Sequence, residues 1–122
     1  MITMSGSVVL GASPNQSKYS YKCVRSLMRH GFVAVPVGKR PGQIEDVEIL
    51  TGQPDIAEVD TVVLYLNKEG QKEYYEYIFS LNPSRIIFNP GTHNQELVDL
   101  AREKGIKVVV DCALIMLSTG SY

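Results

Sequence analysis

Residues 8–27, VVLGASPNQSKYSYKCVRSL, decide the fold of this chain. The apolar run 8–10 is typical of a buried β-strand, and it stops at Gly11. A polar loop follows, and then apolar residues recur at helical spacing. A strand that ends in glycine and leads into a helix predicts an anion site, because the first backbone N–H groups of a helix lack intrahelical partners and carry partial positive charge. An ordinary strand-to-helix connection is the alternative that these residues leave open.

The bulk composition is that of an ordinary globular protein. The chain has 122 residues, of which 44% are hydrophobic and 20% are charged, and its net charge is −1. This length predicts one domain at residues 7–122, preceded by a tail at residues 1–6. A net charge so close to zero gives no general attraction to nucleic acid or to an anionic membrane, so an anion site must come from local geometry.

Targeting and redox signals point to the cytoplasm. The sequence has no apolar run of about 18 residues, so we expect no membrane span. The first residues, MITMSGS, lack a basic segment followed by an apolar one, so we expect no secretory signal. Cys23 and Cys112 are far apart and in no Cys-x-x-Cys pair, which predicts free thiols and no metal site.

Short β-like runs alternate with amphipathic helical segments along the chain. Strands are expected at residues 7–12, 32–37, 44–50, 61–66, 84–89 and 107–111. Helices are expected at residues 18–30, 68–81 and 94–104, with a short helical segment at 112–117. Residues 38–43 are expected to form a loop, and residues 51–59 are rich in turn signals.

This alternation predicts an α/β, Rossmann-like, three-layer fold with a mostly parallel sheet. Right-handed crossovers favour the strand order 3-2-1-4-5-6. Ligands of such sheets bind outside the carboxyl ends of the strands, where the order reverses. We therefore expect a ligand site formed by loops 11–17, 38–42, 66–70 and 89–93.

The first loop lacks the dinucleotide fingerprint. Of the pattern Gly-x-Gly-x-x-Gly only Gly11 is present, and Ser13 occupies the second glycine position. The second strand is followed by Lys39 and Arg40, where an NAD site carries an acidic residue. Positive charge there suits a phosphorylated ribose, as in NADP or coenzyme A (CoA), and the missing glycines favour CoA. A solvated basic loop is the alternative.

Several segments together carry a family resemblance. They are residues 9–24 (VLGASPNQSKYSYKCV), 35–37 (VPV), 89–91 (NPG) and 101–106 (AREKGI) with the strand that follows. They resemble the small CoA-binding domain proteins, which are similar to the CoA-binding domain of the succinyl-CoA synthetase alpha subunit. Many members carry an arginine where this chain has Leu66, Asn67 and Lys68.

The resemblance implies a Rossmann-like fold and a CoA ligand held at the loops. The residues that would approach the CoA phosphates are Gly11, Ala12 and Ser13. The residues that would line the same pocket are Asn15, Lys18, Ser20 and Tyr21. The residues that would face the adenosine 3′-phosphate are Val37, Lys39 and Arg40. The residues that would border the pantetheine arm are Asn89, Pro90 and Gly91. Leu66, at the start of its loop, is assigned to the same site.

No set of catalytic residues is predicted, although Cys112 and His93 fall near the expected cleft. The leading hypothesis is a stand-alone cytoplasmic protein that binds CoA or an acyl-CoA and catalyses no reaction of its own. The alternatives are a small NADP-dependent or other nucleotide-using enzyme, and a protein-interaction domain with a vestigial cleft. The choice between free CoA and an acyl-CoA, the reactivity of Cys112 and His93, and a homodimer or another protein partner all stay open.

Overall fold

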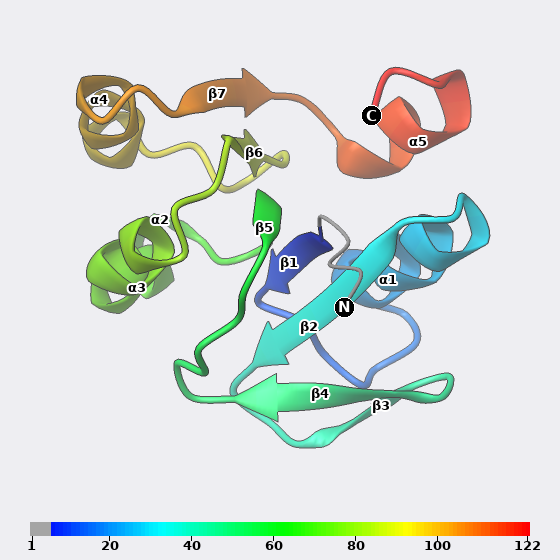
Figure 1. Ribbon diagram of the computed structural model, residues 1–122. Helices are drawn as coiled ribbons and strands as arrows, with labels where there is room; N and C mark the ends of the chain where they lie inside the picture. Colours follow the sequence, from blue (N-terminus) through cyan, green and yellow to red (C-terminus); the bar gives the residue numbers. More distant parts are fainter. Residues whose placement is uncertain (1–5) are drawn as a thin grey trace.

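Seven strands form one sheet in the computed structural model, which describes residues 6–122 (Figure 1). The strands are β1 (Gly6–Leu10), β2 (Val33–Gly38), β3 (Gly42–Ile44), β4 (Val47–Thr51), β5 (Val59–Leu64), β6 (Arg85–Phe88) and β7 (Lys107–Val110). Their order is β3-β4-β2-β1-β5-β6-β7. The predicted fold class is confirmed: every pairing is parallel except that of β3 with β4. Of the predicted tail, residues 1–5 lie outside the described residues, and Gly6 already belongs to β1.

The strand order differs from the prediction at one edge. The six parallel strands follow the expected 3-2-1-4-5-6 order, but β3 adds an antiparallel edge strand next to β4. The strand predicted at residues 44–50 is present as β4, but the predicted loop at 38–43 runs into β3, so this part of the chain is a hairpin and not a loop followed by one strand. The turn between β3 and β4 explains the error: Glu45 adopts a φ of 56°, where hairpins usually place Gly or Asn, so the sequence gives no turn signal. The Glu45 side chain forms an ion pair with Arg25 of the first helix, in which Arg25 Nε donates to Glu45 Oε1 at 2.8 Å.

The helices agree with the predicted ranges, with one interruption. They are α1 (Tyr19–Arg29), α2 (Lys68–Gln71), the 3₁₀ turn η1 (Lys72–Tyr74), α3 (Tyr75–Ser80), α4 (Gln95–Glu103) and α5 (Ala113–Thr119). Residues 68–81 were predicted as one helix, but the 3₁₀ turn η1 divides them into α2 and α3. The buried side chains Gln71, Tyr74, Tyr77 and Ile78 keep the spacing of one apolar face across the interruption. Asn67 caps α2, as predicted, and accepts the Gly70 amide at 2.8 Å.

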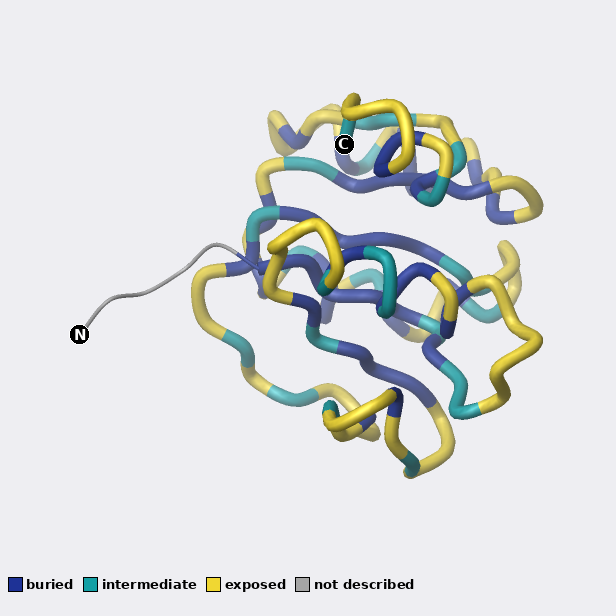
Figure 2. The backbone as a smooth tube through the Cα atoms, turned by 90° about the vertical axis from the view of Figure 1, so that its right-hand side faces the viewer, coloured by how far each residue is buried: buried dark blue, intermediate teal, exposed yellow. Residues whose placement is uncertain are grey.

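The helices cover both faces of the sheet. Figure 1 shows α1 and α5 on one face and α2, α3 and α4 on the other, and Figure 2, seen from the side of α1 and α5, shows long buried stretches in the interior of the molecule. Each face of the sheet has its own hydrophobic core, and alternate side chains of β1 point into one core or the other. Val8 and Leu10 pack in the core under α3 and α4, and Val9 packs in the core under α1 and α5. None of the helices within residues 6–122 has the length and apolar character needed to cross a bilayer.

A buried polar network joins two of the loops at the carboxyl ends of the strands. The Gln71 side chain is fully buried, and its Nε2 donates to the carbonyl oxygens of Leu66 at 2.8 Å and Thr92 at 2.7 Å. Its Oε1 accepts from Asn94 Nδ2 at 3.0 Å. Because Leu66 follows β5 and Thr92 follows β6, one side chain fixes the spacing of the two loops.

We expect Gln71→Leu to lower the free energy of unfolding by about 2–4 kcal/mol, because it leaves two buried carbonyls and one amide group without their partner. Urea denaturation followed by circular dichroism measures this loss. The matched control is Gln95→Leu on the exposed face of α4, which should change stability by less than about 0.5 kcal/mol. Equal stability of the two variants would contradict the role given to Gln71.

Candidate functional site

The loop after β1 leaves the sheet over the end of β2. The backbone amides of Gly11 and Ala12 both donate to the Val37 carbonyl oxygen, at 2.9 and 3.0 Å. These two N–H groups are therefore not free to bind a phosphate, and Gly11 and Ala12 shape the loop rather than donate to an anion. Val37 is fully buried and contributes its carbonyl to this junction.

Two glycines allow the close contact at this junction. Gly11 has a φ of 99°, and a Cβ there would lie 3.0 Å from the Tyr65 carbonyl carbon and 3.1 Å from the Leu66 nitrogen. A Cβ on Gly38 would collide with the Ala12 carbonyl oxygen. Only glycine fits at either position without displacing backbone, so the loop lies pressed against β2 and β5.

The polar part of the loop folds on itself and leads into α1. Asn15 Oδ1 accepts the Ser17 amide at 3.0 Å and the Ser17 hydroxyl at 2.8 Å, and Ser13 Oγ accepts the Asn15 amide at 3.1 Å. Lys18 is the N-cap residue of α1, and its side chain makes no capping hydrogen bond. The first-turn N–H groups of α1 therefore have no side-chain cap, and they carry the partial positive charge of a helix N-terminus.

A cavity of about 440 Å³, which we call the loop cavity, lies between this loop and the end of β2. It is lined by Gly11, Ala12, Ser13, Pro14, Asn15, Lys18, Lys39, Arg40 and Leu66. Its three charged side chains are all basic and exposed. Lys39 Nζ lies 3.7 Å from Glu73 Oε1, an exposed pair that solvent screens. The loop cavity thus combines an uncapped helix start with three positive charges, a combination suited to phosphate groups.

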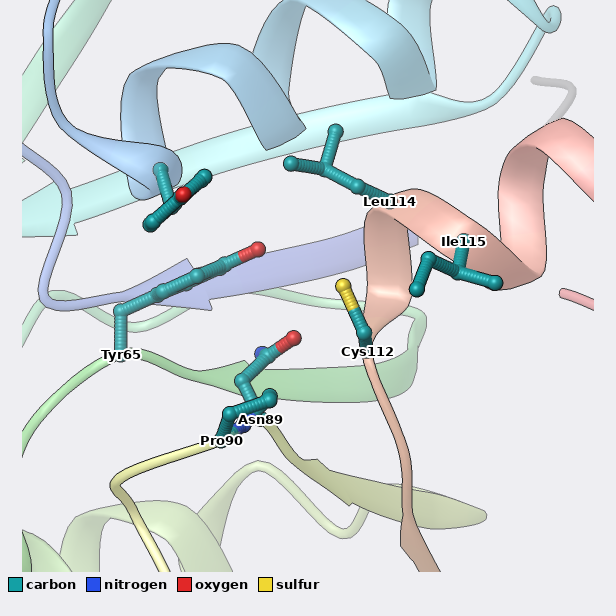
Figure 3. A pocket seen from close by; sticks show the side chains of 7 residues that line it. Tyr65, Asn89, Pro90, Cys112, Leu114 and Ile115 are labelled. Carbon is teal, nitrogen blue, oxygen red and sulfur yellow. The ribbon is translucent and has the colours of Figure 1, made fainter.

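A second cavity, of about 520 Å³, lies between the ends of β5 and β6 and the two helices α1 and α5 (Figure 3). We call it the apolar cavity. Its lining residues are Tyr19, Tyr65, Asn89, Pro90, Cys112, Leu114 and Ile115. Sequence neighbours line the two cavities: Lys18 lines the loop cavity and Tyr19 the apolar cavity, and Leu66 and Tyr65 are divided in the same way.

Asn89 is a structural clamp in the wall of the apolar cavity. Its Nδ2 donates to the Leu64 carbonyl oxygen at 2.9 Å, and its Oδ1 accepts the Ala113 amide at 2.9 Å. The side chain is buried and joins the end of β5 to the first turn of α5. With both ends of its amide used in this way, Asn89 borders the cavity without offering a free polar group.

Tyr65 carries the polar group that sequence reasoning missed. Its hydroxyl is buried and makes no hydrogen bond to a nitrogen or oxygen of residues 6–122, and the Cys23 thiol beside it is a weak partner. Figure 3 shows its side chain pointing toward α5, where Cys112 and Leu114 lie. A buried hydroxyl without a partner costs about 1–3 kcal/mol, so it is a candidate ligand donor. Burial, with Cys23 nearby, raises the pKa of Tyr65 far above its usual range, so the hydroxyl keeps its proton.

The structure brings most of the predicted site residues together, but not all. Gly11, Ala12, Ser13, Asn15, Lys18, Lys39, Arg40 and Leu66 line the loop cavity, and Asn89 and Pro90 line the apolar cavity. Ser20, Tyr21, Val37 and Gly91 line neither cavity: the first three are buried, and Gly91 is exposed. His93 is exposed and lines neither cavity, whereas Cys112 lines the apolar cavity.

Comparison with known proteins gives a family and a fold. A family model described as a CoA-binding domain matches residues 7–118. A crystal structure of an uncharacterized protein is 42% identical, covers 99% of this chain and 100% of its own, and superposes with a TM-score of 0.94. A search of curated proteins found no significant match.

More distant solved structures share the fold alone. One is the structure of cell-free ID.343 from Thermus thermophilus, with a TM-score of 0.85, 21% identity, and coverage of 98% of this chain and 91% of that one. Another is a hypothetical protein from Pyrococcus horikoshii OT3, with a TM-score of 0.84, 19% identity, and coverage of 96% and 83%. The three-layer arrangement thus persists where the sequences have diverged widely.

We expect the two cysteines to react differently with iodoacetamide at about pH 8. Cys23 is fully buried, and burial raises the pKa of its thiol to about 11, so it should stay unmodified in the folded protein. Cys112 is partly exposed in the apolar cavity and should be alkylated. Mass spectrometry of the digested protein identifies the modified residue. The Cys112→Ser variant should take up label only in denaturant, and native labelling of Cys23 would contradict the packing of α1.

Proposed function

The chain belongs to the CoA-binding domain family, and on this basis we propose that it is a stand-alone protein that binds CoA or an acyl-CoA and catalyses no reaction of its own. The observation that carries the proposal is the loop cavity, where the start of α1 and three basic side chains surround one space. CoA has a pyrophosphate and a 3′-phosphate, so it presents negative charge at two separate points. The loop cavity offers positive charge at two places as well, at Lys18 and at the pair Lys39 and Arg40.

We assign the pyrophosphate to the start of α1 and the 3′-phosphate to the basic pair. The amides of Gly11 and Ala12 are occupied by Val37, so the anion would be held by the uncapped N–H groups of α1, by Ser13 and by Lys18. An arginine can bind a phosphate through two parallel hydrogen bonds, and a lysine acts as a point charge. Arg40 and Lys39 then distinguish CoA from nucleotides that lack the 3′-phosphate.

The pantetheine arm would run from the loop cavity into the apolar cavity. It would pass the neighbouring residues Lys18–Tyr19 and Tyr65–Leu66, which are divided between the two cavities, and would reach Asn89 and Pro90 in the wall of the apolar cavity. A cytoplasmic location is part of the proposal, since both cysteines are free thiols.

The double variant Lys39→Ala, Arg40→Ala tests this assignment. In the wild-type protein, calorimetry should show CoA binding at least about tenfold more tightly than dephospho-CoA, a difference of about 1.4 kcal/mol. In the double variant this difference should disappear, because dephospho-CoA lacks the phosphate that the two side chains contact. NADP serves as the competitor that represents a nicotinamide-dependent enzyme.

The matched control is Arg102→Ala, Lys107→Ala. It removes the same charge from exposed side chains at the amino end of the sheet, so it should leave the discrimination intact. No heat and no thermal shift with CoA up to millimolar concentration would overturn the proposal. Tighter binding of NADP than of CoA would do the same.

A further inference from the structure

We propose that the apolar cavity holds the chain of a short or medium acyl-CoA thioester, and that the Tyr65 hydroxyl donates a hydrogen bond to the thioester carbonyl. This inference rests on the proposed function, because the CoA portion must lie in the loop cavity for its acyl group to reach the second one. It goes further by naming acyl-CoA, rather than free CoA, as the preferred ligand. Three features of the apolar cavity support it.

The first feature is position. Tyr19 and Tyr65 of the apolar cavity are next in sequence to Lys18 and Leu66 of the loop cavity, and the apolar cavity extends to Leu114 and Ile115 of α5. In CoA the pantetheine arm runs from the pyrophosphate to the thiol. A ligand with its phosphates beside Lys18 therefore directs its thiol, and any group attached to it, toward α5.

The second feature is the chemistry of the wall. Aliphatic and aromatic side chains form most of the wall of the apolar cavity. The side-chain amide of Asn89 bonds to the Leu64 carbonyl oxygen and the Ala113 amide. Two of the wall residues, Tyr19 and Ile115, are exposed by 68% and 58%, unusually high values for large apolar side chains. A free thiol would cover little of this surface, whereas an acyl chain would remove it from water.

The third feature is the Tyr65 hydroxyl, the unpaired buried donor beside this wall. It points toward the side of α5 that carries Cys112 and Leu114 (Figure 3). A thioester carbonyl is an acceptor that free CoA lacks. Its arrival would give the hydroxyl the partner that the protein does not supply, which makes the bond selective for the acylated form.

The cavity volume limits the length of the chain. At about 520 Å³ the apolar cavity lies within the range of small-molecule sites, and it must also take the end of the pantetheine arm. A short or medium acyl chain fits the remaining space. The distal part of a long chain would have to leave the cavity and return to water.

The experiment is a calorimetric series with CoA, acetyl-CoA, butyryl-CoA, hexanoyl-CoA and palmitoyl-CoA. Affinity should rise from CoA to hexanoyl-CoA by about fourfold per methylene, which corresponds to about 0.8 kcal/mol, and should rise no further with palmitoyl-CoA. If CoA and all acyl-CoAs bind equally, the inference fails while the proposed function stands. If none of them binds, the proposed function itself fails.

Two variants locate the effect. Ile115→Ser should flatten the dependence of affinity on chain length, measured as the ratio of each acyl-CoA affinity to the CoA affinity of the same variant, because the side chain lies on α5, where the acyl group would lie. Its control is Val110→Ser, an equally exposed apolar residue of β7 outside both cavities, which should keep the wild-type series. A flattened series in the Val110 variant would overturn the assignment to Ile115.

Tyr65→Phe should lower the ratio of butyryl-CoA affinity to CoA affinity about fivefold, which corresponds to about 1 kcal/mol. Because the hydroxyl has no hydrogen-bond partner among residues 6–122 besides the weak Cys23 thiol, thermal stability should change little. Tyr74→Phe, a buried tyrosine on the opposite face of the sheet, is the control and should bind both ligands as the wild type does. Unchanged butyryl-CoA affinity in Tyr65→Phe would overturn the hydrogen bond.

Discussion

The backbone carbonyl of Val37 accepts two hydrogen bonds, from the amides of Gly11 and Ala12, at the point where β1 leaves the sheet. This junction requires that neither Gly11 nor Gly38 carry a side chain, since a Cβ on either would meet backbone atoms. It directs residues 13–18 outward over the end of β2, and it places the start of α1 beside the loop that follows β2. The loop cavity exists because these two segments are held at this spacing.

Two buried amide side chains hold the remaining loops. Gln71 links the loop after β5 to the loop after β6, and Asn89 links the end of β5 to the start of α5. Asn89 bonds to backbone groups, and Gln71 bonds to two backbone carbonyls and to the Asn94 side chain, so both fix distances between loops and leave ligand recognition to other residues. The walls of the apolar cavity are thus set before a ligand arrives, which lowers the ordering cost of binding.

The local distribution of charge, and not the net charge, indicates what this protein can bind. Its net charge of −1 would predict no affinity for an anion, yet the loop cavity collects three basic side chains at one helix start. The second cavity is apolar, and beside it lies the buried Tyr65 hydroxyl, which has no nitrogen or oxygen partner within residues 6–122. This division matches a ligand with phosphates at one end and a less polar arm at the other, the shape and polarity of CoA and its thioesters.

The sequence by itself determined the alternation of strands and helices, the order of the six parallel strands, and the basic loop at Lys39 and Arg40. The strands and helices follow from local periodicity, and the strand order follows from the rules for connecting parallel strands. The place of the basic loop at the carboxyl edge follows because parallel strands all end at that edge. The tertiary structure decided the β3–β4 hairpin, the occupied amides of Gly11 and Ala12, and the apolar cavity at Tyr65 and α5. The physical reason is that each of these features depends on contacts between segments that are distant in the chain. The local spacing of residues does not determine which carbonyl an amide bonds to or which helix packs beside the end of a strand.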